Sequence, residues 1–162
     1  MMEKKSYTYE EAVDYALQIP KFTKKNTPEE DTRRFYEYLG RPGERSGLIH
    51  VAGTNGKGSV CSYINAVLSG AGRRTGLFTS PHLVDVRERF RLDGEMISKE
   101  EFARCFNQVM DSVKAFCEKN QEEYHPTFFE MLFFISMLWF QEKGADYIIL
   151  ETGMGGRLDA TN

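Results

Sequence analysis

Residues 50–60 read His-Val-Ala-Gly-Thr-Asn-Gly-Lys-Gly-Ser-Val, and this stretch decides the fold. The apolar run 48–52 predicts a strand, and an apolar-periodic pattern over residues 59–71 predicts a helix. The loop between them holds three glycines, Lys57 and Ser59. Glycine lets backbone N–H groups point inward, the N-terminus of a helix adds a partial positive charge, and lysine adds a full one. The stretch therefore predicts a socket for the phosphates of a nucleotide.

The loop departs from the commonest phosphate-loop pattern, G-x-x-x-x-G-K-[ST], in which the hydroxyl residue directly follows the lysine. Here Gly58 separates Lys57 from Ser59. The alternative for a glycine-rich loop is a tight turn without a ligand, but the strand before it and the helix after it favour phosphate binding.

Length and composition describe one ordinary domain. The chain has 162 residues, 41% of them hydrophobic and 28% charged, which is typical of a globular protein with a real core. A formal net charge of −3 argues against a nucleic-acid partner. The three cysteines form no CxxC pair, and no segment has the length of a signal sequence or a membrane span. We therefore expect a cytoplasmic protein without a membrane partner, and a monomer.

The order of predicted elements indicates an α/β fold. Helices are expected over residues 9–19 and 28–39, a strand over 48–52, a helix over 59–71 and a strand over 74–78. Residues 79–93 are expected to be a long polar connection. Ser98 and Thr127 each begin a capping-box pattern, which predicts helices to about residues 120 and 143. The buried run Tyr147 to Leu150 predicts a last strand. These crossover units predict a mostly parallel sheet flanked by helices.

Four further blocks of sequence stand out, and the last is dense in glycine and polar residues typical of a functional loop. They are Gly76 to Leu83, Glu88 to Phe90, Pro126 to Glu130, and the final block, residues 151–162, Glu-Thr-Gly-Met-Gly-Gly-Arg-Leu-Asp-Ala-Thr-Asn. Natural domains seldom finish inside such a block, so we expect that the chain is truncated.

Together with the phosphate loop, these blocks resemble folylpolyglutamate synthase and the bifunctional dihydrofolate synthase, within the Mur ligase superfamily. The resemblance implies an N-terminal portion with a three-layer, phosphate-loop-type α/β fold similar to the Mur ligase central domain. Residues 1–47 are expected to form a helical segment packed on the core, and residues 48–162 an incomplete ATP-binding domain. A C-terminal glutamate-binding domain is expected to be absent.

The same resemblance implies an ATP-dependent ligase that adds L-glutamate to folates, and in some members to dihydropteroate, through an acyl phosphate. A fragment without the second domain is expected to be inactive. The cofactors implied are ATP and Mg²⁺, with Lys57 and Glu151 as catalytic residues. The residues implied for ATP are Gly53, Thr54, Asn55, Gly56, Lys57, Gly58 and Ser59.

Metal and substrate residues are also implied by the resemblance. Ser80 and Glu151 are implied as magnesium ligands, and Ser59 faces the metal or caps its helix. Substrate contacts are expected from His82, Thr127, Phe129, Glu130, Arg157, Leu158 and Asp159. Each has a plainer interpretation: Ser80 is a turn residue before a proline, and Glu130 is the third residue of a capping box. The arginines at 87, 89 and 91 alternate, so in an extended segment they form one face, by default a solvated one.

Two other functions compete with the main hypothesis. One is another Mur-type amide ligase, such as an enzyme of peptidoglycan precursors. The other is a module that binds ATP without catalysing ligation.

Overall fold

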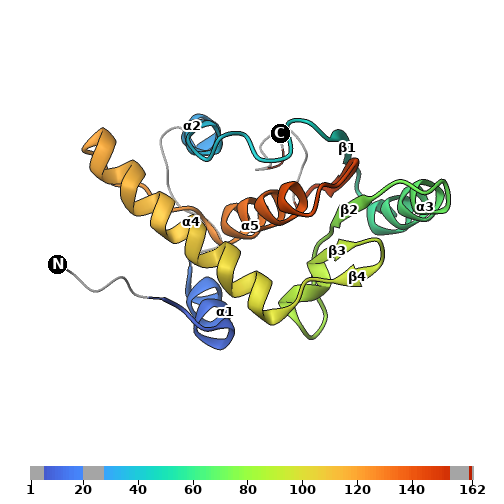
Figure 1. Ribbon diagram of the computed structural model, residues 1–162, viewed down its shortest axis with the longest axis horizontal. Coiled ribbons are helices and arrows are strands. Elements are labelled where there is room, and N and C mark those ends of the chain that lie inside the picture. Colours follow the sequence, from blue (N-terminus) through green and yellow to red (C-terminus); the bar gives the residue numbers. More distant parts are fainter. Residues whose placement is uncertain (1–5, 20–27, 154–160, 162) are drawn as a thin grey trace.

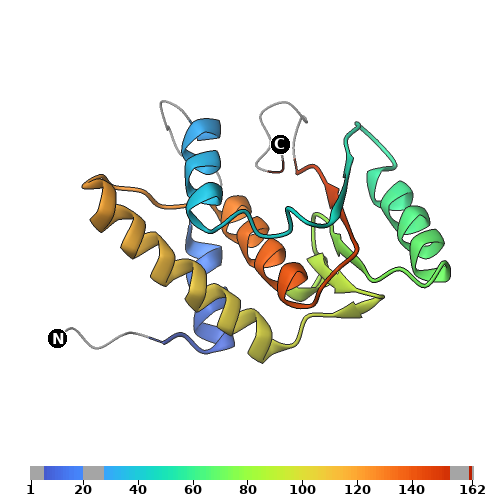
Figure 2. The same cartoon turned by 45° about the horizontal axis from the view of Figure 1, so that its top comes forward.

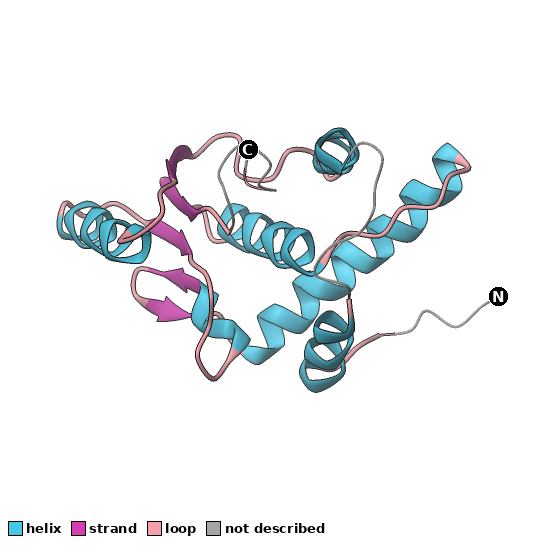
Figure 3. Cartoon of the chain, turned by 180° about the vertical axis from the view of Figure 1, so that it is seen from behind, coloured by secondary structure: helices cyan, strands magenta, loops and turns pink. Residues whose placement is uncertain are grey.

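The computed structural model describes residues 6–19, 28–153 and 161. Within these ranges a five-stranded sheet has the order β1-β5-β2-β3-β4. Helix α3 lies on one side of the sheet, and the remaining helices lie on the other (Figure 1). The view from behind shows the same layers, with the strands between α3 and the other helices (Figure 3).

The parallel part of the sheet agrees closely with the sequence. Strand β1 (Gly47–Val51) pairs in parallel with β5 (Tyr147–Glu151), and β5 pairs in parallel with β2 (Thr75–Phe78). Helix α3 (Lys57–Gly70) connects β1 to β2. All three strands therefore end at one edge of the sheet, which is where α/β proteins place their ligands.

The segment after β2 differs from the expected polar connection. It contains a short 3₁₀ helix, η1 (Val86–Arg89), and strands β3 (Phe90–Leu92) and β4 (Glu95–Met96), both antiparallel to their neighbours. The expectation of a connection without regular structure was wrong. Two strands of three and two residues are too short to show a periodicity, and only their pairing beside β2 defines them.

The helices on the second face are α1 (Tyr9–Gln18), α2 (Pro28–Tyr38), α4 (Lys99–Asn120) and α5 (Phe128–Glu142). Helix α5 lies between the sheet and the other three helices of this face. Helix α4 runs beside α5 in Figure 1 and in Figure 2. Capping boxes begin α1 at Thr8, α4 at Ser98 and α5 at Thr127. No helix in the described ranges is long and apolar enough to span a bilayer.

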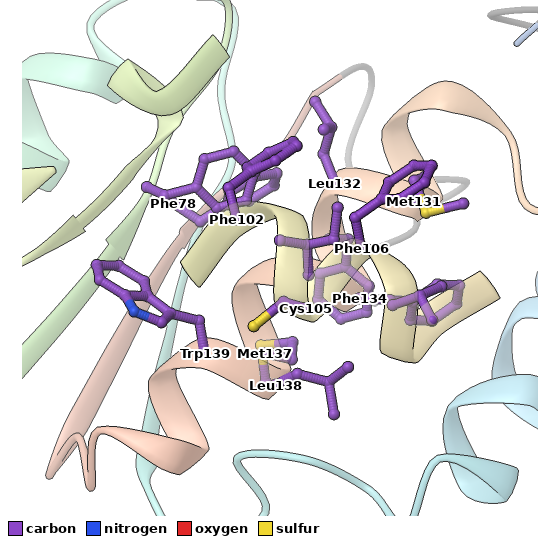
Figure 4. Close-up of a cluster of buried hydrophobic side chains, with 14 of the residues drawn as sticks. Phe78, Phe102, Cys105, Phe106, Met131, Leu132, Phe134, Met137, Leu138 and Trp139 are labelled. Carbon is purple, nitrogen blue, oxygen red and sulfur yellow. The ribbon is translucent and has the colours of Figure 1, made fainter. Parts of the chain in front are cut away.

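The core has two layers because side chains of a strand alternate between the faces. On the α5 side, Phe78 and Trp139 lie in a large hydrophobic cluster that also includes Phe102, Cys105 and Phe106 of α4 (Figure 4). Gly76 lets α5 approach the sheet, since a Cβ there would stand 2.7 Å from the ring of Phe140. On the α3 side, Leu77 and Ile149 pack against Cys61. Glu151 follows Ile149 by two residues, so its side chain belongs to the α3 face.

Candidate nucleotide-binding site

The phosphate loop lies between β1 and α3. Gly56 is the N-cap of α3 in the left-handed conformation, with φ of 76°, and provides no side-chain cap. A residue with a Cβ is strained at that φ, which accounts for the glycine. Because the cap is bare, the first N–H groups of the helix remain available to an anion. Residues 52–56 are exposed, so a ligand has access to them.

Lys57 folds back over this loop. It is the first residue of α3, and its Nζ donates a 3.0 Å hydrogen bond to the carbonyl oxygen of Gly53. Ser59 lies in the first turn of the same helix and is exposed. The loop thus holds one ammonium group and one hydroxyl beside a bare helix N-terminus, which is the arrangement expected for binding phosphates.

Glu151 is the acid of this region. It ends β5 and is only 5% exposed, and its Oε2 accepts a 3.0 Å hydrogen bond from the backbone N–H of Ser80. A Cβ built on Gly58 would lie 3.9 Å from both carboxylate oxygens. The extra glycine of the loop therefore leaves the space between α3 and the carboxylate open. The structure brings Gly58, Ser80 and Glu151 together, while their roles toward ATP and magnesium stay predictions.

Arg89 is the residue that sequence reasoning misjudged. It is 6% exposed, its Nε donates a 2.8 Å hydrogen bond to Nδ1 of His82, and its guanidinium lies over the Phe128 ring, 5.6 Å from the centroid. Burial lowers the pKa of the guanidinium, and the negative charge of Glu151 opposes that shift. The sequence held one signal, which is that Arg89 lies in the block Glu88 to Phe90, one of the blocks that carry the family resemblance.

The three alternating arginines do not form one solvated face. Arg87 is paired with Asp85, with Nη2 2.7 Å from Oδ2, and Arg91 donates from Nη1 to the carbonyl oxygen of Gly94. Only Arg89 is buried among them. The expectation failed because residues 86–89 form a 3₁₀ helix, in which alternate residues do not point the same way.

The loop between Ser80 and η1 is held by a carboxylate. Glu88 accepts hydrogen bonds of 2.8–3.0 Å from the backbone N–H groups of Leu83, Val84 and Asp85. These bonds lower the pKa of Glu88. The loop is thereby fixed beside the carboxyl edge of the sheet, which is the edge at which β1, β5 and β2 end. Leu83 and Val84 are almost fully exposed.

The weaker substrate candidates lie around the start of α5. Thr127 caps that helix, and Glu130 accepts hydrogen bonds from the Thr127 N–H, at 2.6 Å, and from the Thr32 hydroxyl. Phe129 packs on Phe78, with ring centroids 5.6 Å apart. Substrate contact by these residues stays a prediction. Arg157, Leu158 and Asp159 lie outside the described residues.

A magnesium ion fits the donor set at the carboxyl edge. Within the described ranges no three residues among His, Cys, Asp and Glu gather into a metal cluster. Mg²⁺ does not need one, since it is usually bound through one or two carboxylates together with substrate phosphates and water. One buried carboxylate, Glu151, beside a phosphate loop meets that requirement.

Fold and loop together define a class: a phosphate-loop α/β protein with a mixed sheet flanked by helices. No protein-family model matches the chain. It is 47% identical over 119 residues to folylpolyglutamate synthase of Arabidopsis thaliana, covering 71% of the chain and 20% of that protein. It is 43% identical over 126 residues to dihydrofolate synthase/folylpolyglutamate synthase of Bacillus subtilis, covering 76% of the chain and 29% of that protein.

Solved structures agree with these relatives. A complex of folylpolyglutamate synthase with AMPPCP and folate superposes with a TM-score of 0.89 at 29% identity, covering 96% of the chain and 38% of that structure. The chain is therefore homologous to part of the folylpolyglutamate synthase and dihydrofolate synthase proteins, which confirms the predicted resemblance. It spans only 20% and 29% of the length of the two curated relatives.

Proposed function

We propose that the complete protein carrying these residues is an ATP-dependent ligase that adds L-glutamate to folates, and to dihydropteroate if it is bifunctional. The observation that carries the proposal is the position of Glu151, between the phosphate loop at Gly58 and the backbone of Ser80. The names of the relatives, and the AMPPCP and folate in the similar complex, support the same substrates.

ATP is proposed to bind through residues 53–59. The backbone N–H groups of the first turn of α3 hold the phosphates, and Lys57 exchanges its bond to the Gly53 carbonyl for a phosphate oxygen. The positive charges lie where negative charge gathers during phosphoryl transfer, so they stabilise the transition state more than the ground state.

Magnesium is proposed to bind between Glu151, Ser80 and Ser59. Within the described residues, neither serine hydroxyl has a hydrogen-bond partner, so both are available as ligands. The bound ion supplies charge neutralisation for the phosphates. The 3.0 Å bond from the Ser80 N–H orients the Glu151 carboxylate.

The proposed reaction has two displacements. An oxygen of the acceptor carboxylate attacks the γ-phosphorus of ATP, so that one P–O bond forms, the bond to ADP breaks and an acyl phosphate results. The amino group of L-glutamate then attacks the acyl carbon, an amide bond forms, and inorganic phosphate leaves while the nitrogen loses a proton. The chain's part is to hold two anions close together, which they resist without neighbouring cations.

The complete protein is proposed to be divided into domains. Residues 48–162 belong to the ATP-binding domain, residues 1–47 pack on it, and glutamate is held by a further domain. The 162 residues alone are then inactive in ligation. The complete protein is also proposed to be a cytoplasmic monomer, and three free thiols fit the reducing conditions of that compartment.

The test is turnover of the complete protein with ATP, Mg²⁺ and L-glutamate, given tetrahydrofolate or dihydropteroate separately. ADP release that requires both glutamate and a folate acceptor is the expected result. Release only with UDP-muramyl acceptors favours the peptidoglycan-type ligase, and binding of ATP without glutamate-dependent release favours the non-catalytic module. Ligation by the 162 residues alone contradicts the proposed organisation.

A further inference from the structure

The carboxyl edge of the sheet carries two cations, one on each side of Glu151. Strand order places the ends of β1, β5 and β2 next to one another, with β3 beyond β2. The phosphate loop follows β1, Glu151 ends β5, Ser80 follows β2, and Arg89 directly precedes β3. Neighbouring strands are about 4.8 Å apart. Lys57 and Arg89 therefore belong to opposite ends of this row of strand ends.

Arg89 is buried at its end of this row and is not exposed on the surface. Its carbonyl oxygen accepts a 3.1 Å bond from the Thr79 N–H, its Nε donates to His82, and its plane lies over Phe128. Within the described residues, no oxygen accepts a hydrogen bond from Nη1 or Nη2. Arg89 is only 6% exposed, and its Nη1 and Nη2 groups, the fork of the guanidinium, are unused by the described residues. Burying such a charge is costly unless an anion accepts hydrogen bonds from this fork.

We propose that Arg89 binds the acceptor carboxylate, the group that ATP activates, with Nη1 and Nη2 on its two oxygens. The inference rests on the proposed ligase function. The nucleotide phosphates are proposed to bind at the phosphate loop with Lys57, on the far side of Glu151 from Arg89. Arg89 is therefore placed for the second anion of the reaction, and its contacts with His82 and Phe128 fix the direction of the fork.

The test uses the complete protein and a matched pair of ligands, tetrahydrofolate and tetrahydrofolate with its γ-carboxylate converted to the primary amide. Calorimetry in the presence of AMPPCP measures the Kd of each. The wild type is expected to prefer the free carboxylate by at least about tenfold, as loss of a hydrogen bond to a charged group predicts. Arg89→Met loses that preference, while the Kd of AMPPCP stays within about twofold.

Arg91→Met is the control, since it removes the same charge from a more exposed position two residues away. Thermal unfolding of each variant verifies the fold. If Arg89→Met does not fold, Arg89→Lys keeps the charge but loses the fork and is expected to show a reduced preference. An unchanged preference in the folded variants, or a loss of AMPPCP affinity instead, overturns the inference. Absence of any ligation by the wild type overturns the proposed function itself.

Discussion

The backbone N–H of Ser80 donates a 3.0 Å hydrogen bond to Oε2 of Glu151, across 71 residues of sequence. The bond joins the ends of β2 and β5, and it holds a carboxylate that is almost fully buried. A buried charge is retained only where hydrogen bonds or cations compensate it. The site is thus organised around an acid whose position depends on two strands.

Replacing Lys57 by Ala should lower the turnover of the complete protein by about 10²–10³-fold, because one positive donor to the transferring phosphate is lost. ADP release at saturating substrates measures the effect. Lys114→Ala, on the exposed side of α4, is the control. Near-normal turnover of the Lys57 variant would show that another residue neutralises the phosphates.

Gly58→Val should weaken binding of magnesium–AMPPCP by at least about tenfold, or ~1.4 kcal/mol. The added methyl groups fill the space in front of the Glu151 carboxylate, whereas Gly58→Ala makes only an ordinary contact at 3.9 Å. Calorimetry of both variants separates the two cases. Equal affinities for Val and Ala would mean that no ligand occupies this space.

Glu130→Ala should lower the free energy of unfolding by about 1–3 kcal/mol, because Thr32 and the Thr127 N–H lose a buried acceptor. Urea unfolding measures the change, with the exposed Glu118→Ala as the control. If stability is unchanged while the KM of the folate acceptor rises, Glu130 serves the substrate rather than the fold.

Thiol chemistry should separate the three cysteines. Burial raises the pKa of Cys61 and of Cys105 to about 11, and the charge of Glu151 adds to the shift at Cys61. Both thiols should resist iodoacetamide at a mildly alkaline pH in the folded protein, while the half-buried Cys117 reacts first. Peptide mass spectrometry locates the label, and rapid labelling of Cys61 would contradict the packing of α3.

The same shifts predict a loss of stability in alkali. A thiol whose folded pKa exceeds its unfolded value, about 8.5, stabilises fully below that pH and loses its contribution as the pH rises toward 11. The midpoint temperature of thermal unfolding should therefore decrease as the pH is raised from about 8.5 to 11. A midpoint that is constant over this window would contradict the burial of these thiols.

Local chemistry made much of the fold predictable. The caps at Thr8, Ser98 and Thr127 mark the starts of α1, α4 and α5, and the glycine-rich loop marks the start of α3. The place of Glu151 at the end of a buried strand followed from the same kind of signal. The burial of Arg89 did not, because it depends on how the chain returns beside β2 as β3, a contact that no local pattern encodes.

The pairing of β1 with β5 has a consequence for how the protein folds. Val51, at the start of the phosphate loop, stands in register with Glu151, so the loop meets its acid only when distant parts of the chain have joined. Closing such a long loop costs entropy before any contact repays it, and contacts of this kind slow folding. The helices can form early from local signals, whereas the proposed nucleotide site is expected to be completed late, because it needs β5 in place between β1 and β2.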